Sequence, residues 1–157
     1  GYGGYPNQKW GFQEATQLGG AGNYRTNNSK YVNCLGYALE LNVWVNPAMN
    51  YGETVDTVYN RVVTEAKKYG KICRKLSSKD AYLRPYEYKV AMRVGSHNGN
   101  FDYHFMVQVK QNGWAHKRGQ TPSEFLGAIN PSTYNWGSLY GVSNFYDSST
   151  LYFAVTR

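Results

Sequence analysis

Apolar residues recur at helical spacing in two stretches of the first half of the chain. Residues 34–45 (CLGYALELNVWV) show this spacing and follow Asn33, a residue type that often caps the N-terminus of a helix. Residues 53–69 repeat the pattern, and Gly70 is a natural stop for the helix that they form. The pattern therefore predicts one helix over 34–45 and a second over 53–69.

The second half of the chain changes to the alternation that is typical of a β-sheet. Alternating stretches are separated by the turn sequences SHNGN and QNG, whereas residues 119–150 are rich in Gly, Pro, Asn and Ser and are expected to be irregular. Helices followed by an antiparallel sheet predict an α+β fold, with N-terminal helices packed on a C-terminal antiparallel β-sheet. The expected strands are 86–94, 102–110, 114–118 and 151–157.

Length and composition fit one domain that covers residues 1–157. A chain of 157 residues is long enough to bury a core of its own. With a mean hydropathy of −0.63, it contains no run of about 18 apolar residues that would predict a transmembrane segment. Residues 1–30 are rich in Gly, Asn and Tyr and predict a peripheral N-terminal arm.

The net charge of +7 is concentrated on one segment. Residues 67–93 hold nine basic and two acidic residues, whereas the rest of the chain has eight of each. A concentrated positive field favours polyanionic partners such as an anionic cell wall, a membrane surface or nucleic acid. A solvated face that aids solubility has the same composition, so both interpretations stay open.

Cys34 and His104 are the strongest candidates for chemistry. Cys34 begins the first expected helix, where unpaired N–H groups and the helix dipole favour a thiolate of lowered pKa and can stabilise an oxyanion. His104 lies in a later strand, and its imidazole can take the thiol proton if that strand packs on the start of the helix. A buried cysteine that only packs is the plain alternative. Asp102 can tune His104 or simply end the turn before the strand.

Cys73 has no histidine partner in the pattern and is interpreted as structural. The sequence leaves open whether Cys34 and Cys73 form a disulfide, because bridging depends on their distance in space. Since the chain has no CxxC or HExxH motif, we do not expect a structural zinc site, and a metal site built from His97, His104, His116 and Cys34 is the open alternative. The hydrolase interpretation below requires no metal and no organic cofactor.

The residues around Cys34 and His104 resemble two motifs of the NlpC/P60 superfamily of papain-like cysteine peptidases and amidases. NCLGYAL is similar to the motif in which the nucleophilic cysteine opens a helix. YHFMVQVKQNGWAHK is similar to the motif with the catalytic histidine and, across a hairpin, a further polar residue. The tract from Asp102 to Pro131 also resembles an uncharacterised bacterial and phage branch. The resemblance covers residues 31–131 and implies a papain-like fold of the NlpC/P60 type.

The resemblance implies a triad in which Cys34 is the nucleophile, His104 the general base and His116 the residue that orients His104. A two-residue turn at Asn112–Gly113, however, would place His116 several residues from His104 and on the other face of the sheet. Contact between the two histidines therefore requires a bulge or a shifted register. Asn130 is the alternative third member, because papain-like enzymes also use an asparagine there.

The remaining candidate residues concern the substrate. Asn28 lies six residues upstream of the cysteine, roughly where papain-like enzymes place an amide for the oxyanion. Trp114 and Trp136 are candidates for lining a groove, since aromatic faces stack on apolar ligand surfaces. Lys117 and Arg118 are candidates for binding a substrate carboxylate at the rim of that groove.

The resemblance implies a secreted cysteine hydrolase of bacterial or phage origin, with the whole chain as one catalytic domain. It would cleave an amide bond through an acyl-enzyme, and peptidoglycan stem peptides are the expected substrate of such a cell-wall hydrolase or antibacterial toxin. We expect a monomer that needs no nucleic acid partner, with an inhibitor or immunity protein as a candidate partner. Two alternatives stay open: a protease, deamidase or acyltransferase toxin that acts on proteins, and a non-enzymatic module that binds polyanions through residues 67–93.

Overall fold

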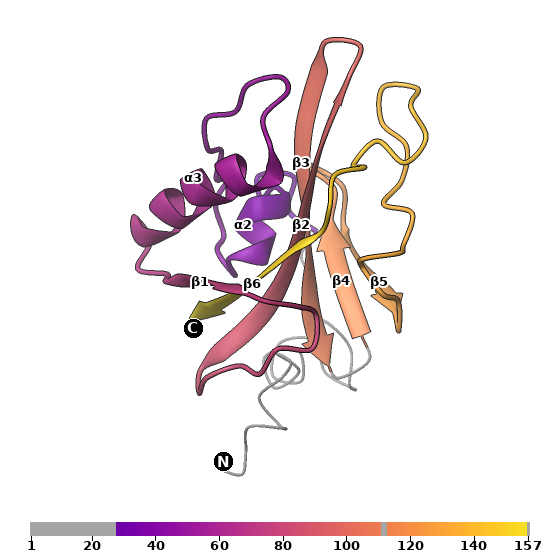
Figure 1. The fold of residues 1–157 in the computed structure, drawn as a ribbon. Helices are drawn as coiled ribbons and strands as arrows, with labels where there is room; N and C mark the ends of the chain where they lie inside the picture. The colour runs from indigo at the N-terminus through magenta and orange to yellow at the C-terminus, as the bar shows by residue number, and fades with distance from the viewer. Residues whose placement is uncertain (1–27, 111–112, 157) are drawn as a thin grey trace.

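The computed structural model describes residues 28–110 and 113–156 and has a mixed α/β fold (Figure 1). In this part of the chain, two helices precede a six-stranded antiparallel sheet of order β1-β6-β2-β3-β4-β5, so the expected order of helices and sheet is confirmed. Residues 1–27 of the expected arm lie outside the described residues. The elements are α2 (Cys34–Ala38), α3 (Val55–Lys67), β1 (Cys73–Leu76), β2 (Glu87–His97), β3 (Asn100–Lys110), β4 (Gly113–Lys117), β5 (Ser123–Gly127) and β6 (Leu151–Thr156).

Helix α2 is much shorter than the predicted helix over 34–45, so that prediction is wrong beyond its first turns. The chain turns at Glu40, whose φ is 58°, and the N–H of Leu41 bonds back to the carbonyl of Gly36 at 2.9 Å. It then runs back beside the helix, where a Cβ on Gly36 would lie 2.0 Å from the carbonyl oxygen of Val43. The apolar residues after the turn therefore belong to a returning loop.

Asn33 holds both the start of α2 and the returning loop. Its Oδ1 accepts the N–H of Gly36 at 2.9 Å and the N–H of Val45 at 3.0 Å, and its Nδ2 donates to the carbonyl of Val45 at 2.6 Å. The residue is only 4% exposed, so these bonds satisfy polar groups that water does not reach. The predicted cap is confirmed, and it fixes the place of the adjacent Cys34.

Helix α3 matches the prediction over 53–69 to within two residues at each end, with Thr54 as its N-cap. No helix among the described residues is long and apolar enough to cross a bilayer. Strands β2 and β3 extend further than predicted and meet in a two-residue turn, in which Asn98 and Gly99 have φ values of 53° and 82°. Strands β1 and β5 were not predicted, and β5 falls in the stretch 119–150 that the composition marks as irregular.

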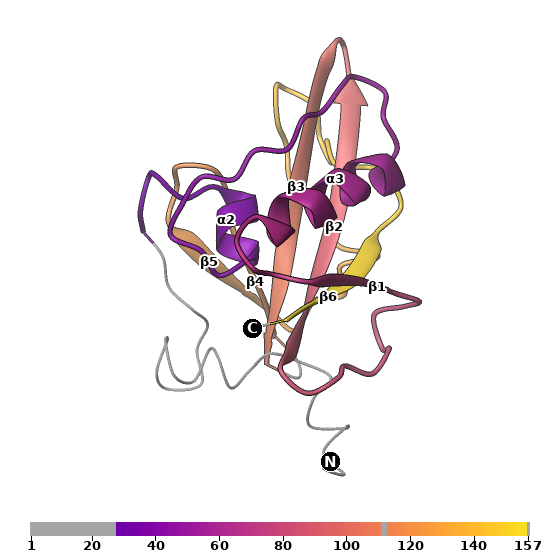
Figure 2. The same cartoon turned by 90° about the vertical axis from the view of Figure 1, so that its left-hand side faces the viewer.

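The sheet is covered on both faces by different parts of the chain (Figures 1 and 2). Helices α2 and α3 lie over one face and bury apolar residues such as Leu35, Val62 and Phe153. The other face has a second apolar cluster, in which Trp136 and Phe145 from the long loop before β6 take part. Because strand side chains alternate, neighbouring residues of β3 point into different layers.

The basic segment 67–93 does not form one exposed positive surface. Lys89 and Arg93 are only 1% and 6% exposed, and their charged groups donate to backbone carbonyls of the loops beside them. Arg74 forms an ion pair of 2.7 Å with Glu87. Part of the concentrated positive charge is therefore used inside the fold.

Replacing Asn33 by alanine should destabilise the fold more than the loss of an ordinary helix cap. We expect the free energy of unfolding to fall by about 2–4 kcal/mol, because the buried backbone groups of Val45 also lose their side-chain partner. The matched variant Thr54→Ala, which removes the cap of α3, should cost about 1 kcal/mol. Urea unfolding followed by circular dichroism measures both changes, and equal losses would contradict the linking role of Asn33.

Candidate active site

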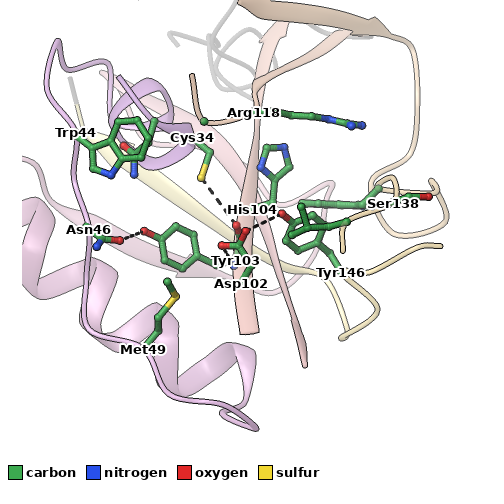
Figure 3. Close-up of a pocket in the computed structure, with 14 residues that line it drawn as sticks. Cys34, Trp44, Asn46, Met49, Asp102, Tyr103, His104, Arg118, Ser138 and Tyr146 are labelled. Atoms are coloured by element: carbon green, nitrogen blue, oxygen red, sulfur yellow. Dashed lines mark hydrogen bonds between the residues drawn. The ribbon is translucent and has the colours of Figure 1, made fainter. Parts of the chain in front are cut away.

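A cavity of about 430 Å³ lies beside the start of α2, and both Cys34 and His104 line it. Figure 3 shows Trp44, from the loop after α2, on one side of this cavity, and Ser138 and Tyr146, from the loop before β6, on the other. Cys34 and His104 lie between these walls. The structure thus brings together the two residues that the sequence singled out for chemistry.

Cys34 meets the sheet beside the backbone of β3. Its thiol donates to the carbonyl of Tyr103 at 3.9 Å, and α2 packs against both β3 and β4. Strand β4 pairs with β3 only from Val107 to Lys110. Cys34 contacts β3 outside this range, at Tyr103. The thiol therefore lies next to the residue that precedes His104 in the strand.

The contact between His104 and His116 comes from a register that differs from the predicted one. Lys110 pairs with Gly113, which replaces the predicted turn at 112–113, and a bulge follows in the pairing. Val107 therefore pairs with Ala115, so that the next residue of β4, His116, comes closer to His104 than the predicted register allows and lies on the same face. The bulge that direct contact required is present.

Three strands supply a row of hydrogen-bonded side chains. Nε2 of His104 lies 2.8 Å from Nδ1 of His116, and Nε2 of His116 lies 2.9 Å from Oε1 of Glu124 on β5. The two histidines are 3% and 1% exposed, whereas the Glu124 side chain is 63% exposed. Tyr146 stacks on His104 with ring centroids 5.4 Å apart, which restrains the catalytic candidate from its other side. Both imidazoles are therefore held in fixed orientations.

Burial keeps both histidines neutral. It lowers the pKa of His104 well below the usual histidine range, and the nearby His116 and Arg118 lower it further. Burial also lowers the pKa of His116, although the hydrogen bond to Glu124 opposes this effect. A neutral imidazole at His104 has a free lone pair and is able to act as a base.

The Cys34 thiol is also neutral, which corrects the lowered pKa expected at a helix N-terminus. Burial raises the pKa of Cys34, and the negative charge of Asp102 raises it further. The backbone N–H groups of Leu35 and Cys34 oppose these effects but are outweighed. Cys34 and Cys73 are both free thiols, so the two cysteines are not bridged. The resting pair is therefore a thiol beside a neutral imidazole.

The cavity contains one acidic and one basic side chain besides these groups. Asp102 lies within β3 rather than at the end of a turn, and its carboxylate accepts the N–H of Tyr103 at 2.8 Å and the hydroxyl of Tyr146 at 3.2 Å. Burial raises the pKa of Asp102. Arg118 also lines the cavity and is exposed. Groups of both signs are thus available to a charged ligand.

Lys117 is buried rather than at the rim of a groove, which corrects its predicted role. Its side chain points to the helix side of the sheet, and its ammonium donates to the backbone carbonyls of Val32 and Gly119. This contact ties β4 to the residue that precedes the Asn33 cap. Of the two predicted carboxylate-binding cations, only Arg118 lines the cavity.

Three other predicted site residues lie outside the lining of the cavity. Trp114 is 2% exposed and packs on Tyr152 in the second apolar cluster, so its predicted place in a groove is wrong, whereas Trp136 does line the cavity. Asn130 lies in an exposed turn, where its Oδ1 accepts the N–H of Ser132 at 3.0 Å. Asn28 is exposed at the start of the described chain. The histidine contact at His104 is made by His116.

Sequence reasoning missed Glu124 and Tyr146, which both lie in the stretch interpreted as irregular. The short strand that carries Glu124 follows Pro122 and ends at Gly127, whose φ is 80°, and these residues are a weak hairpin signal. Tyr146 lies in a loop and had no such signal. Within residues 28–110 and 113–156, no group of three or more His, Cys, Asp or Glu side chains is arranged to hold a metal ion.

Comparison of the chain with models of known protein families, with curated proteins and with solved structures found no match. The interpretation of the cavity therefore rests on the residues that line it.

Alkylation of Cys34 should be slow at neutral pH and should accelerate as the pH rises. Because the thiolate is the reactive species, a raised pKa leaves less of it at any given pH. In a Cys73→Ser background, we expect iodoacetamide to react at pH 7 at least about tenfold more slowly than with a short peptide thiol, and the rate to rise past pH 9. Mass spectrometry of the native protein measures these rates.

The reciprocal variant Cys34→Ser reports the second thiol alone, whose pKa is raised to about 12 by burial. A plateau of the Cys34 labelling rate, with an apparent pKa below about 8.5, would contradict the neutral resting pair.

Proposed function

We propose that this protein is a cysteine hydrolase that cleaves an amide bond, with Cys34 as nucleophile, His104 as general base and His116 as the residue that orients His104. The contact of 2.8 Å between the two buried imidazoles, beside a cysteine at the start of a helix, carries this proposal. The resemblance to the NlpC/P60 superfamily supports the same three roles and the papain-like type of fold.

Because Cys34 and His104 are both uncharged at rest, the first step combines attack by sulfur with transfer of the thiol proton. As the Cys34 sulfur attacks the substrate carbonyl carbon, the thiol proton passes to His104, so that no isolated charge has to exist in the buried site beforehand. The carbonyl oxygen gains the negative charge. The backbone N–H groups of Cys34 and Leu35, which begin a short helix, are the donors available to this oxyanion.

Collapse of the tetrahedral intermediate gives a thioester on Cys34. The C–N bond breaks, and the imidazolium of His104 returns its proton to the departing amine. A water molecule then gives a proton to His104 and attacks the thioester carbonyl. The acid product leaves, and the thiol and neutral imidazole are restored.

The proposed substrate is a peptidoglycan stem peptide, which makes the protein a cell-wall hydrolase or an antibacterial toxin that acts outside the cell. A peptide with both amino and carboxylate groups suits a cavity that carries Asp102 and Arg118. The half-exposed Trp44 adds aromatic surface for the apolar parts of such a peptide, whereas Trp136 lines the cavity from the buried second cluster. An inhibitor or immunity protein would bind over this same opening.

Hydrolysis of purified peptidoglycan, with released fragments identified by mass spectrometry, tests the proposal. We expect Cys34→Ala and His104→Ala each to lower the rate by about 10³-fold or more, because the nucleophile or its base is lost. The matched variant Cys73→Ala should keep the activity, since Cys73 lies in β1 and does not line the cavity. Thermal unfolding of each variant provides the check on folding.

A parallel assay of protein cleavage, deamidation and acyl transfer separates the two substrate classes. If products form from proteins and none from peptidoglycan, the proposed cell-wall substrate is wrong, while the proposed role of Cys34 stands. Activity that survives Cys34→Ala in either assay would contradict the proposed nucleophile.

A further inference from the structure

The histidine pair is linked to a third side chain that no family motif predicted. Glu124 lies directly opposite His116 in the pairing of β4 with β5, and its carboxylate oxygen is 2.9 Å from Nε2 of that histidine. His104, His116 and Glu124 therefore form a continuous row across β3, β4 and β5. The row begins at the cavity and ends at the surface, where Glu124 meets solvent.

The carboxylate at the Glu124 end determines which ring nitrogens of the two histidines carry hydrogen. A carboxylate only accepts hydrogen bonds, so Nε2 of His116 carries a hydrogen. Because His116 is neutral, its Nδ1 has a lone pair and accepts, and Nε2 of His104 must then donate. A neutral His104 that is protonated at Nε2 has its remaining lone pair at Nδ1.

We propose that Glu124 is a positioning residue that fixes the tautomers of His116 and His104, so that the Nδ1 lone pair of His104 is the base for the Cys34 thiol. This inference rests on the proposed function. The opposite tautomer chain keeps the same bond between the rings but leaves a hydrogen on Nδ1 of His104. In that state the imidazole has no lone pair free for the thiol proton.

The other side chains around His104 and His116 do not select between the two tautomers. Tyr146 stacks on the ring of His104, and its hydroxyl donates to Asp102. Arg118 disfavours an additional proton on either imidazole without selecting a nitrogen. The ammonium of Lys117 is bound to backbone carbonyls. Among the described residues, Glu124 is the group with a hydrogen bond to the outer nitrogen of the row.

Variants of Glu124 test this role through both rate and spectroscopy. Glu124→Ala removes the acceptor, and we expect kcat/KM to fall by about tenfold, a part of the 10²–10⁴-fold that general-base catalysis contributes. KM should change little, since Glu124 does not line the cavity. Glu124→Gln keeps an acceptor oxygen and should lose about threefold. Asp80→Asn, which neutralises another exposed carboxylate, is the matched control and should leave kcat/KM unchanged.

Two-bond proton–nitrogen NMR spectra of the imidazoles distinguish protonated from bare ring nitrogens and need no substrate. The wild type should show both histidines protonated at Nε2 and bare at Nδ1 at neutral pH, and Glu124→Ala should shift the signals toward a tautomer mixture. A wild-type His116 protonated at Nδ1, or spectra and kcat/KM that do not respond to Glu124→Ala, would overturn the inference.

The two readouts separate this inference from the proposed function. If tautomers respond to Glu124 but the wild type hydrolyses no peptide or protein, the proposed function and the catalytic part of the inference fail together. If hydrolysis requires Cys34 but neither tautomers nor rates respond to Glu124, the inference alone fails.

Discussion

His104 and His116 share a hydrogen bond and are both buried, and burial disfavours a positive charge on either imidazole. This constraint keeps His104 uncharged at rest, with a lone pair on its ring. The same burial keeps the thiol of Cys34 protonated. Both groups are therefore uncharged at rest, and in the proposed function the thiol proton passes to His104 only during attack.

The start of α2 holds Cys34 against the backbone of β3, and two buried polar side chains fix this part of the helix. Asn33 caps the helix and fixes the returning loop, while Lys117 fixes the carbonyl just before the cap. Each makes at least two hydrogen bonds to the backbone. A buried lysine thus helps to fix the start of the helix on which Cys34 lies.

Much of this arrangement could be predicted from the sequence, and the limits have physical causes. Periodicity located α3 and the long strands, and residue type located the Asn33 cap, because these depend on local spacing. The end of α2 was missed because a backbone turn at Glu40 and the close contact at Gly36 override helical periodicity. The bond between His104 and His116 depends on a bulge, and strand patterns do not encode the register that a bulge creates. Glu124 was missed because its strand is short and follows a loop of irregular composition.

The central claim is that Cys34 forms a covalent acyl intermediate with the help of His104. Acid quenching of the protein during incubation with peptidoglycan stem peptides, followed by intact-mass and peptide mass spectrometry, tests it most directly. We expect a mass gain equal to the acyl part of the cleaved peptide, located on Cys34 and absent in His104→Ala. Hydrolysis that proceeds with no adduct on Cys34, or with an adduct on another residue, would contradict the claim.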